Sequence, residues 1–148
     1  MKVKRPAGSV GSALTAILAC AALQSCATNQ REPVRPLRPL ELAKSAYDGN
    51  VVEQLTGALA FEHDCLLFRS DIGGPLLTPI WPEGSSFDGT SVKYHEPARQ
   101  EQPLLIAEHF VMGGRRVTWQ QLSAPSYRPF QHQCQAEPFL VSAVRPAD

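Results

Sequence analysis

The sequence lacks an apolar run long enough to span a membrane. No charged residue lies between Val10 and Leu23, but a spanning helix needs about 20 apolar residues and this run is shorter. Lys2, Lys4 and Arg5 precede the run, and polar residues follow it. A basic stretch followed by a short apolar stretch is typical of an export signal that is removed from the mature protein.

The sequence also lacks an excess of positive charge. Its 14 basic and 14 acidic residues balance, and loss of a leader ending at Ser25 would leave 11 basic and 14 acidic residues, a net charge of about −3. The local basic cluster consists of Arg115 and Arg116. Because proteins that bind phosphate backbones need a basic surface, this composition argues against nucleic acid as a partner.

Sequence motifs of known enzymes are absent as well. There is no Gly-x-Ser-x-Gly, and neither Ser85 nor Ser86 has a neighbouring base that would activate it. Residues 113–116 lack the spacing of a phosphate-binding loop, and they predict a turn that leads into a strand ending at Trp119. We therefore expect a non-enzymatic protein without a cofactor, and the alternative is an enzyme that uses Ser85, Ser86 or His63.

The apolar run ends in a short motif. Leu23, Gln24, Ser25 and Cys26 resemble the lipobox of bacterial lipoproteins, in which a leucine, a variable residue and a small residue precede a cysteine that is diacylated. The resemblance implies that Cys26 becomes the mature N-terminus and anchors the chain to a membrane of the bacterial cell envelope. Since Ala27 and not Asp follows, it implies the periplasmic face of the outer membrane if the source is Gram-negative.

Two other cleavage sites remain open. Residues 19–21, "ACA", fit an ordinary signal peptidase, and "ILAC", which ends at Cys20, is a second lipobox-like stretch. Cysteine parity favours Cys26. Cleavage before it discards Cys20 and leaves Cys65 and Cys134 as a pair, whereas ordinary cleavage would leave an odd thiol.

Residues 26–50 predict a tether. Pro33, Pro36 and Pro39 recur at every third position, which favours polyproline II and prevents a helix. The stretch from Leu40 to Tyr47 could add two helical turns before the domain begins. The expected organisation is a signal peptide at 1–25, the tether at 26–50 and a folded domain at 51–148.

From Val51 onward the hydrophobic pattern is that of strands, and turn signals recur about every ten residues. Gly57 marks a bend, residues 62–64 a hairpin turn, and Pro79 an edge position or a bend. The pattern predicts an all-β domain, either a small antiparallel barrel (OB-like) or a sandwich. The predicted strands are 51–61, 65–70, 75–81, 90–94, 103–110, 115–119 and 138–144.

The order of these segments is similar to that in a group of uncharacterised bacterial exported and lipid-anchored proteins. In that group a Gly-x-Leu strand, a cysteine-containing strand, a Trp-Pro turn and a late cysteine recur on a small β domain. The corresponding features here are Gly57, Cys65, Trp81 with Pro82, and Cys134. The resemblance implies a two-cysteine β domain over residues 55–145 and no known activity.

The motif His-x-Cys occurs twice, at His63 with Cys65 and at His132 with Cys134. Side chains at i and i+2 of a strand share a face, so two such pairs could form a Cys2His2 site for zinc or copper with a metal-binding or redox function. In an oxidising envelope the same cysteines form a disulfide instead, which is the outcome we expect. Two free thiols are the third alternative.

The longest polar connection is "WPEGSSFDG", residues 81–89. Trp81, Phe87 and Asp88 in this loop are the expected contacts to a partner, which would be an envelope protein or a glycan. An aromatic ligand platform, with core packing as the competing role, is the alternative for Trp81, Trp119, Tyr127 and Phe130. The sequence thus predicts a binding or scaffolding module held at a membrane through Cys26.

Overall fold

The computed structural model describes residues 41–97 and 102–148. All of these residues belong to one compact unit of the chain. The predicted signal peptide, Cys26 and most of the predicted tether lie outside the described residues. Within the described ranges no helix is long and apolar enough to cross a membrane.

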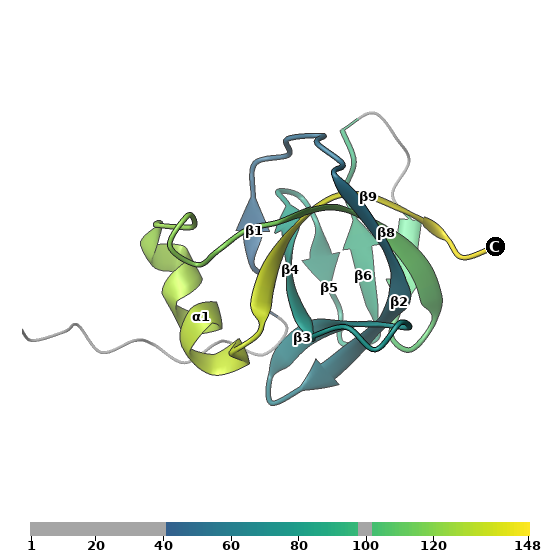
Figure 1. Cartoon of the computed structure of the whole chain (residues 1–148), viewed down its shortest axis with the longest axis horizontal. Helices are drawn as coiled ribbons and strands as arrows, with labels where there is room; N and C mark the ends of the chain where they lie inside the picture. Colours follow the sequence, from purple (N-terminus) through teal and green to yellow (C-terminus); the bar gives the residue numbers. More distant parts are fainter. Residues whose placement is uncertain (1–40, 98–101) are drawn as a thin grey trace, which may run out of the picture. The chain divides into compact units, whose positions relative to one another are not determined.

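The described residues fold mainly into strands, with one short α-helix and one 3-10 helix (Figure 1). The strands are β1 (Lys44–Ser45), β2 (Glu53–Glu62), β3 (Cys65–Ser70), β4 (Leu77–Pro82), β5 (Ser86–Phe87), β6 (Ser91–Tyr94), β7 (Gln102–Leu105), β8 (His109–Arg116) and β9 (Glu137–Pro146). The helical segments are η1 (Pro125–Tyr127) and α1 (Arg128–Cys134).

Five strands close into a barrel-like ring. Neighbouring strands pair in the order β4, β3, β2, β8 and β9, and β9 pairs back with β4 to close the ring. The pairing of β4 with β9 is parallel, while the other pairs in the ring are antiparallel. The expectation of a small barrel-like β domain is therefore confirmed, with a parallel closure that the sequence did not reveal.

Gly57 is the point at which β2 changes partners. It faces Ser70 of β3 on one side and Phe110 of β8 on the other, and Ala58 also pairs with both strands, so β2 pairs with β8 alone before Gly57 and with β3 alone after Ala58. A Cβ at this position would lie 2.1 Å from the carbonyl oxygen of Arg69. The strand can make this close approach only because glycine has no side chain, which explains the predicted bend.

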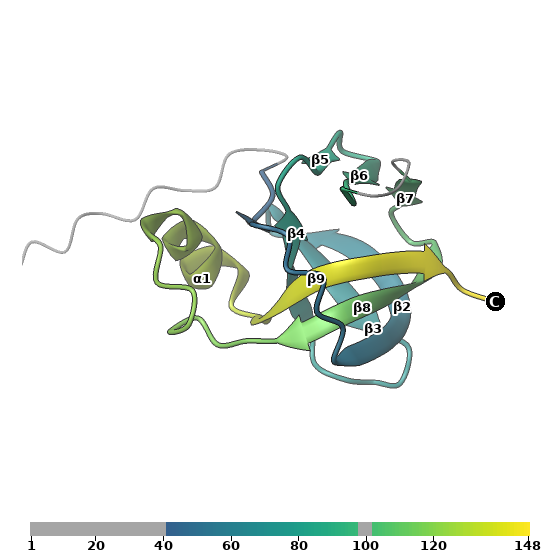
Figure 2. The same cartoon turned by 90° about the horizontal axis from the view of Figure 1, so that it is seen from above.

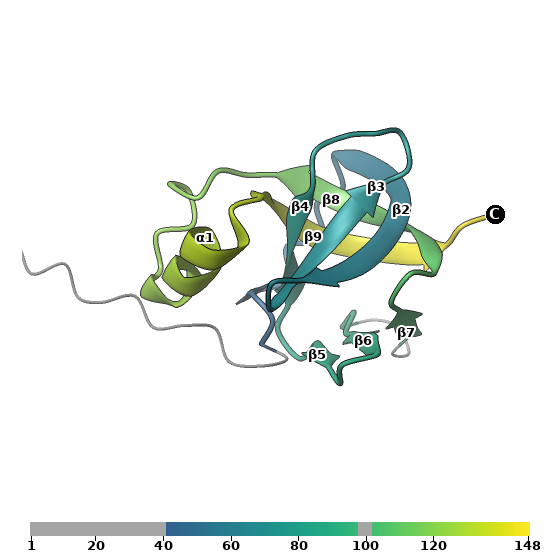
Figure 3. The same ribbon diagram turned by 90° about the horizontal axis from the view of Figure 1, so that it is seen from below.

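A second, three-stranded sheet follows β4 in the chain. Its order is β5, β6, β7, and Figures 2 and 3 show it at one side of the ring. Buried residues of this sheet and of the ring belong to one hydrophobic cluster. Phe87 and Val92 come from the sheet, and Phe68, Trp81 and Phe139 from the ring. The shared core fixes the sheet against the barrel.

Pro79 lies inside β4, yet β4 is not at the edge of the sheet. Leu77 pairs with β3 and Trp81 pairs with β1, while the opposite side of β4 pairs with β9. Because amide directions alternate along a strand, the Pro79 nitrogen faces the gap between the β3 and β1 pairings. A residue without an N–H is tolerated there, since no ladder bond is lost.

Several expected boundaries are wrong. Over its described residues, 41–47, the predicted helix is extended and contains β1, because the Trp81 amide donates to the Ala43 carbonyl and thereby draws this segment onto β4. The predicted strand 103–110 is interrupted at Ala107, whose φ is 66°. The predicted turn at 113–116 lies within β8, where two glycines meet a bulge in the pairing with β9.

The sequence patterns also missed α1. This helix spans only seven residues and has prolines near its start, and Gln135 ends it in a left-handed conformation with φ of 51°. A helix this short is marginal on its own and depends on tertiary contacts. Phe130 supplies one contact by packing in a second hydrophobic cluster between α1 and the barrel.

The disulfide between Cys65 and Cys134 supplies the covalent attachment. It joins the first residue of β3 to the last residue of α1, 69 positions apart, and Cys65 is buried. The Gln133 side-chain amide adds a hydrogen bond of 3.1 Å to the carbonyl of His63 in the β2–β3 turn. The expected disulfide is thus confirmed, and it fastens α1 to the barrel.

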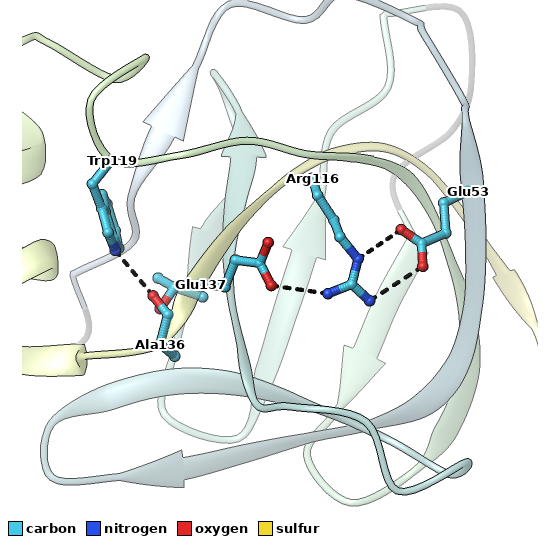
Figure 4. A network of polar contacts seen from close by, with 6 residues as sticks. Glu53, Arg116, Trp119, Ala136 and Glu137 are labelled. Atoms are coloured by element: carbon cyan, nitrogen blue, oxygen red, sulfur yellow. Dashed lines mark hydrogen bonds and ion pairs between the residues drawn. The ribbon is translucent and has the colours of Figure 1, made fainter.

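Polar contacts reinforce the junctions around β8 and β9 (Figure 4). Arg116 forms a bidentate pair with Glu53 of β2 and a third bond, of 2.9 Å, with Glu137 at the start of β9. Beyond β8, the indole N–H of Trp119 donates to the Ala136 carbonyl at 3.0 Å. These bonds fix the segment between β8 and α1 to the start of β9.

Replacement of both Cys65 and Cys134 by serine should lower the free energy of unfolding by roughly 2–5 kcal/mol, because the unfolded chain regains the entropy of a long closed loop. Urea unfolding of the lipid-free domain, followed by far-UV circular dichroism, measures the change. The oxidised and reduced wild-type proteins are the matched pair. A double variant as stable as the oxidised protein would contradict the structural role of this bond.

Candidate functional site

The predicted contact loop, residues 81–89, does not present its aromatic side chains to solvent. Trp81 lies in β4 with 0% of its surface exposed and makes an edge contact with Tyr94. Phe87 lies in β5, is 8% exposed and packs beside Phe61. Trp81 is therefore not an exposed contact, because its side chain fills the core between ring and sheet, whereas Phe87 is mostly buried in the same core and also lines a pocket that is described below.

Asp88 in the same loop is exposed, but its carboxylate is engaged within the loop. One oxygen accepts the amide protons of Thr90 and Ser91 at 2.9 and 2.8 Å, and both hydroxyl groups donate to the carboxylate as well. The backbone bonds are the main cause that holds the pKa of Asp88 far below its usual range. Asp88 therefore shapes the turn between β5 and β6.

The two His-x-Cys pairs do not form a metal site. Both sulfur atoms are in the disulfide, so neither is available as a thiolate ligand. His63 occupies a left-handed turn with φ of 51°, and His132 lies on a helix, so the strand alternation assumed for the tetrahedral site does not apply. Within the described residues no group of three or more His, Cys, Asp or Glu could hold a metal ion.

The serines of the enzyme alternative have separate environments. Ser85 is fully buried, and its hydroxyl oxygen accepts the backbone amide of His95 at 3.1 Å. This bond fixes the loop before β5 to the end of β6. Ser86 is exposed and lies on β5. The Ser85 hydroxyl thus has a structural partner inside the fold, whereas the Ser86 hydroxyl lies at the surface.

A pocket of about 380 Å³ opens between β1, β5 and the η1–α1 segment. Glu41, Leu42 and Lys44 line it from the β1 segment. Ser86 and Phe87 line it from β5, and Ser126, Tyr127 and Phe130 line it from η1 and α1. Rings and one aliphatic side chain supply the apolar part of the lining, while hydroxyl groups and two charges supply polar groups, a combination suited to ligand recognition.

Tyr127 closes one side of this pocket. Its hydroxyl group donates a hydrogen bond of 2.8 Å to the carbonyl oxygen of Lys44, so it joins η1 to the outer side of β1. Burial of the ring and the negative charge of Glu83 raise the pKa of Tyr127. The hydroxyl therefore stays protonated at neutral pH and remains a donor.

The segment that carries β1 is fixed at its far end by Asp48. Ser142 donates to the Asp48 carboxylate at 2.7 Å, and the Asn50 amide and the Arg115 guanidinium donate to it as well. Burial alone would raise the pKa of Asp48, but these hydrogen bonds outweigh it and lower the pKa. The β1 wall of the pocket is thus attached to β8 and β9.

The described surface has other concavities with simpler linings. One, of about 470 Å³, is bounded by polar side chains on and just after α1, namely Arg128, Gln131, His132 and Gln135. Another, of about 300 Å³, lies between β7 and the start of β8 and is mostly apolar. The pocket beside β1 differs from both because its lining combines apolar, hydroxyl and charged groups.

The sequence pointed to four residues of this pocket, but it predicted other roles for them. Ser86 was a candidate nucleophile, Phe87 a loop contact, and Tyr127 and Phe130 members of an aromatic platform. Trp81 and Trp119 lie elsewhere, the first in the core and the second against the α1–β9 junction. Lys44 was missed because it was assigned to a helix in the tether.

Comparisons of this chain with protein-family models, with curated proteins and with solved structures found no match.

The low pKa of Asp88 makes the β5–β6 turn sensitive to acid. A depressed carboxyl pKa stabilises the fold at pH values above the unfolded pKa of 3.8, and this contribution is lost as the pH falls through the lower, folded pKa. Carbon-detected NMR should show the Asp88 carboxyl titrating below its ordinary range. In Ser91→Ala, which removes one donor, the midpoint should rise, and an ordinary midpoint in the wild type would contradict the described turn.

Proposed function

We propose that the protein is a membrane-anchored lipoprotein of the bacterial cell envelope, and that its β domain is a non-enzymatic module that binds an envelope partner. The motif that ends at Cys26 supports the anchor. The disulfide between Cys65 and Cys134 is consistent with export, because such bonds persist in oxidising compartments. With Ala27 after the lipidated cysteine, the destination in a Gram-negative cell is the periplasmic face of the outer membrane.

The observation that carries the binding role is the pocket beside β1. Its volume of about 380 Å³ lies within the usual range for binding sites, and its lining combines Phe87 and Phe130 with Lys44 and three hydroxyl groups. Both rings are also part of the core clusters, the disulfide fastens α1 to β3 of the barrel, and the Tyr127 hydrogen bond joins η1 to β1. A preformed pocket loses little conformational entropy when a partner binds.

The basic cluster offers no competing site for an anionic partner. Arg115 pairs with Asp48, and Arg116 pairs with Glu53 and Glu137. Each guanidinium group therefore has carboxylate partners within the fold. This arrangement gives no support to nucleic acid as a partner.

Replacement of Cys26 by serine should abolish the membrane association of the full-length chain, since the lipid supplies the membrane affinity. Fractionation of cells into membrane and soluble parts, followed by immunodetection, measures the effect. Cys20→Ser is the matched control and should leave the protein in the membrane fraction. Membrane association of the Cys26 variant equal to that of the wild type would refute the anchor.

A photo-crosslinking residue in place of Ser126, which is exposed and lines the pocket, should produce a discrete adduct in intact cells of the source organism. The same substitution at exposed Ser123, which does not line the pocket, is the matched control and should give none. Ser126→Trp, which fills the pocket, should remove adducts formed from a crosslinker at Lys44. Identical adducts from positions 126 and 123, or none from either, would count against the pocket as the binding site.

A further inference from the structure

The outer edge of β1 faces the pocket. Trp81 donates its amide to the carbonyl of Ala43, and Glu83 donates to the carbonyl of Ser45, so the odd-numbered residues of this segment bond to β4. In a parallel pair the residues between them direct both backbone groups to the other side. Lys44, which lies between Ala43 and Ser45, therefore directs its amide and carbonyl groups away from β4, and it lines the pocket together with Leu42.

The hydrogen bond of Tyr127 supports this orientation independently. Its hydroxyl group reaches the Lys44 carbonyl from η1, on the side of β1 opposite to β4. The pocket thus lies between a strand edge and the helical segment, with the rings of Phe87 and Phe130 in its lining. An exposed strand edge is a template for pairing with another extended chain.

We propose that the pocket binds an extended peptide segment of an envelope protein, which adds as a strand to the outer edge of β1. The inference rests on the proposed function of this pocket as the partner site. The Lys44 amide donates to a peptide carbonyl, and a peptide N–H replaces the Tyr127 hydroxyl at the Lys44 carbonyl. Main-chain pairing supplies affinity in this mode of recognition, and side-chain pockets supply specificity.

The lining determines which peptide fits. Side chains of an added strand alternate in direction, so one residue of the peptide enters the pocket while its neighbours point away. Leu42, Phe87 and Phe130 favour an apolar side chain at the inserted position. The preceding Pro33, Pro36 and Pro39 segment of this chain is a poor occupant, because proline has no N–H to donate to a strand edge.

The test uses the mature chain 26–148 carrying Cys26→Ser, and as probes a set of acetylated, amidated ten-residue peptides in which threonine alternates with valine, leucine or phenylalanine. Binding is followed by fluorescence anisotropy and by amide NMR shifts. At least one peptide should bind saturably and shift the Lys44 amide. N-methylation of its backbone at the paired positions should weaken binding about tenfold or more, while methylation at the alternate positions has little effect.

Three variants test where and how the peptide binds. Ser126→Trp should abolish peptide binding, and Ser123→Trp should leave it unchanged. Tyr127→Phe should strengthen binding severalfold, because the hydroxyl no longer competes for the Lys44 carbonyl, and weaker binding by this variant would contradict strand addition. Equal binding of both N-methylated series would also contradict it.

The outcomes separate this inference from the proposed function. If no peptide binds but the crosslinker at Ser126 still yields a specific adduct in cells, the peptide inference fails and the binding site stands. Binding of soluble envelope saccharides that Ser126→Trp abolishes has the same consequence. If the Ser126 crosslinker also yields nothing specific, the proposed function fails together with the inference.

Discussion

The parallel pairing of β4 with β9 is the constraint on which the rest of the structure depends. Without it the ring would be an open, curved sheet with two long edges. Two parallel neighbours cannot be joined by a tight turn, so a long connection must link them. The chain between β4 and β9 provides this connection, and it contains the second sheet, β8, η1 and α1. The same strand β4 also pairs with β1, and Ala43 beside β1 packs in one hydrophobic cluster with Phe130 of α1.

The pocket follows from this arrangement because its walls come from segments that the closure brings together. Each wall has its own attachment to the barrel. Asp48 fixes the segment that carries β1, the disulfide fixes α1, and Phe87 of β5 packs in the hydrophobic cluster that the second sheet shares with the ring. The Tyr127 hydroxyl then links two of the walls directly. Since α1 is too short to be stable alone, the covalent bond to β3 positions the side chain of Phe130 in the pocket.

The sequence predicted those features that leave a local pattern. The bend at Gly57, the hairpin at His63 and Asp64, and the strand β3 all follow from turn residues and hydrophobic runs, and cysteine parity predicted the disulfide. Features that depend on distant partners were missed. Glycines in β8 indicated a turn, but they lie at a bulge where a Cβ on Gly114 would approach the Leu140 carbonyl within 1.9 Å.

Among the pocket and loop residues, too, local patterns were predicted and features that depend on distant partners were missed. Trp81 and Phe87 flank a polar loop, and their burial depends on the second sheet packing against the ring, which no local pattern reports. Lys44 and its neighbours have the composition of a helix, but β4 recruits them as a strand through two backbone bonds. The pocket could be predicted only in part, since Phe87, Tyr127 and Phe130 were noted as aromatic candidates while their common location depends on the closure of the barrel.

The central claim is that the outer edge of β1 bounds a preformed pocket and that the Lys44 amide points into it, and amide hydrogen exchange of the lipid-free mature chain tests it most directly. The Ser45 amide faces β4 in the parallel register, whereas the Lys44 amide faces the pocket. We predict slow exchange at Ser45 and exchange at Lys44 at least about tenfold faster, since a bonded strand amide exchanges only when the structure opens. Equal, strong protection at both residues would contradict the claim, because it would mean that the outer edge of β1 is already paired.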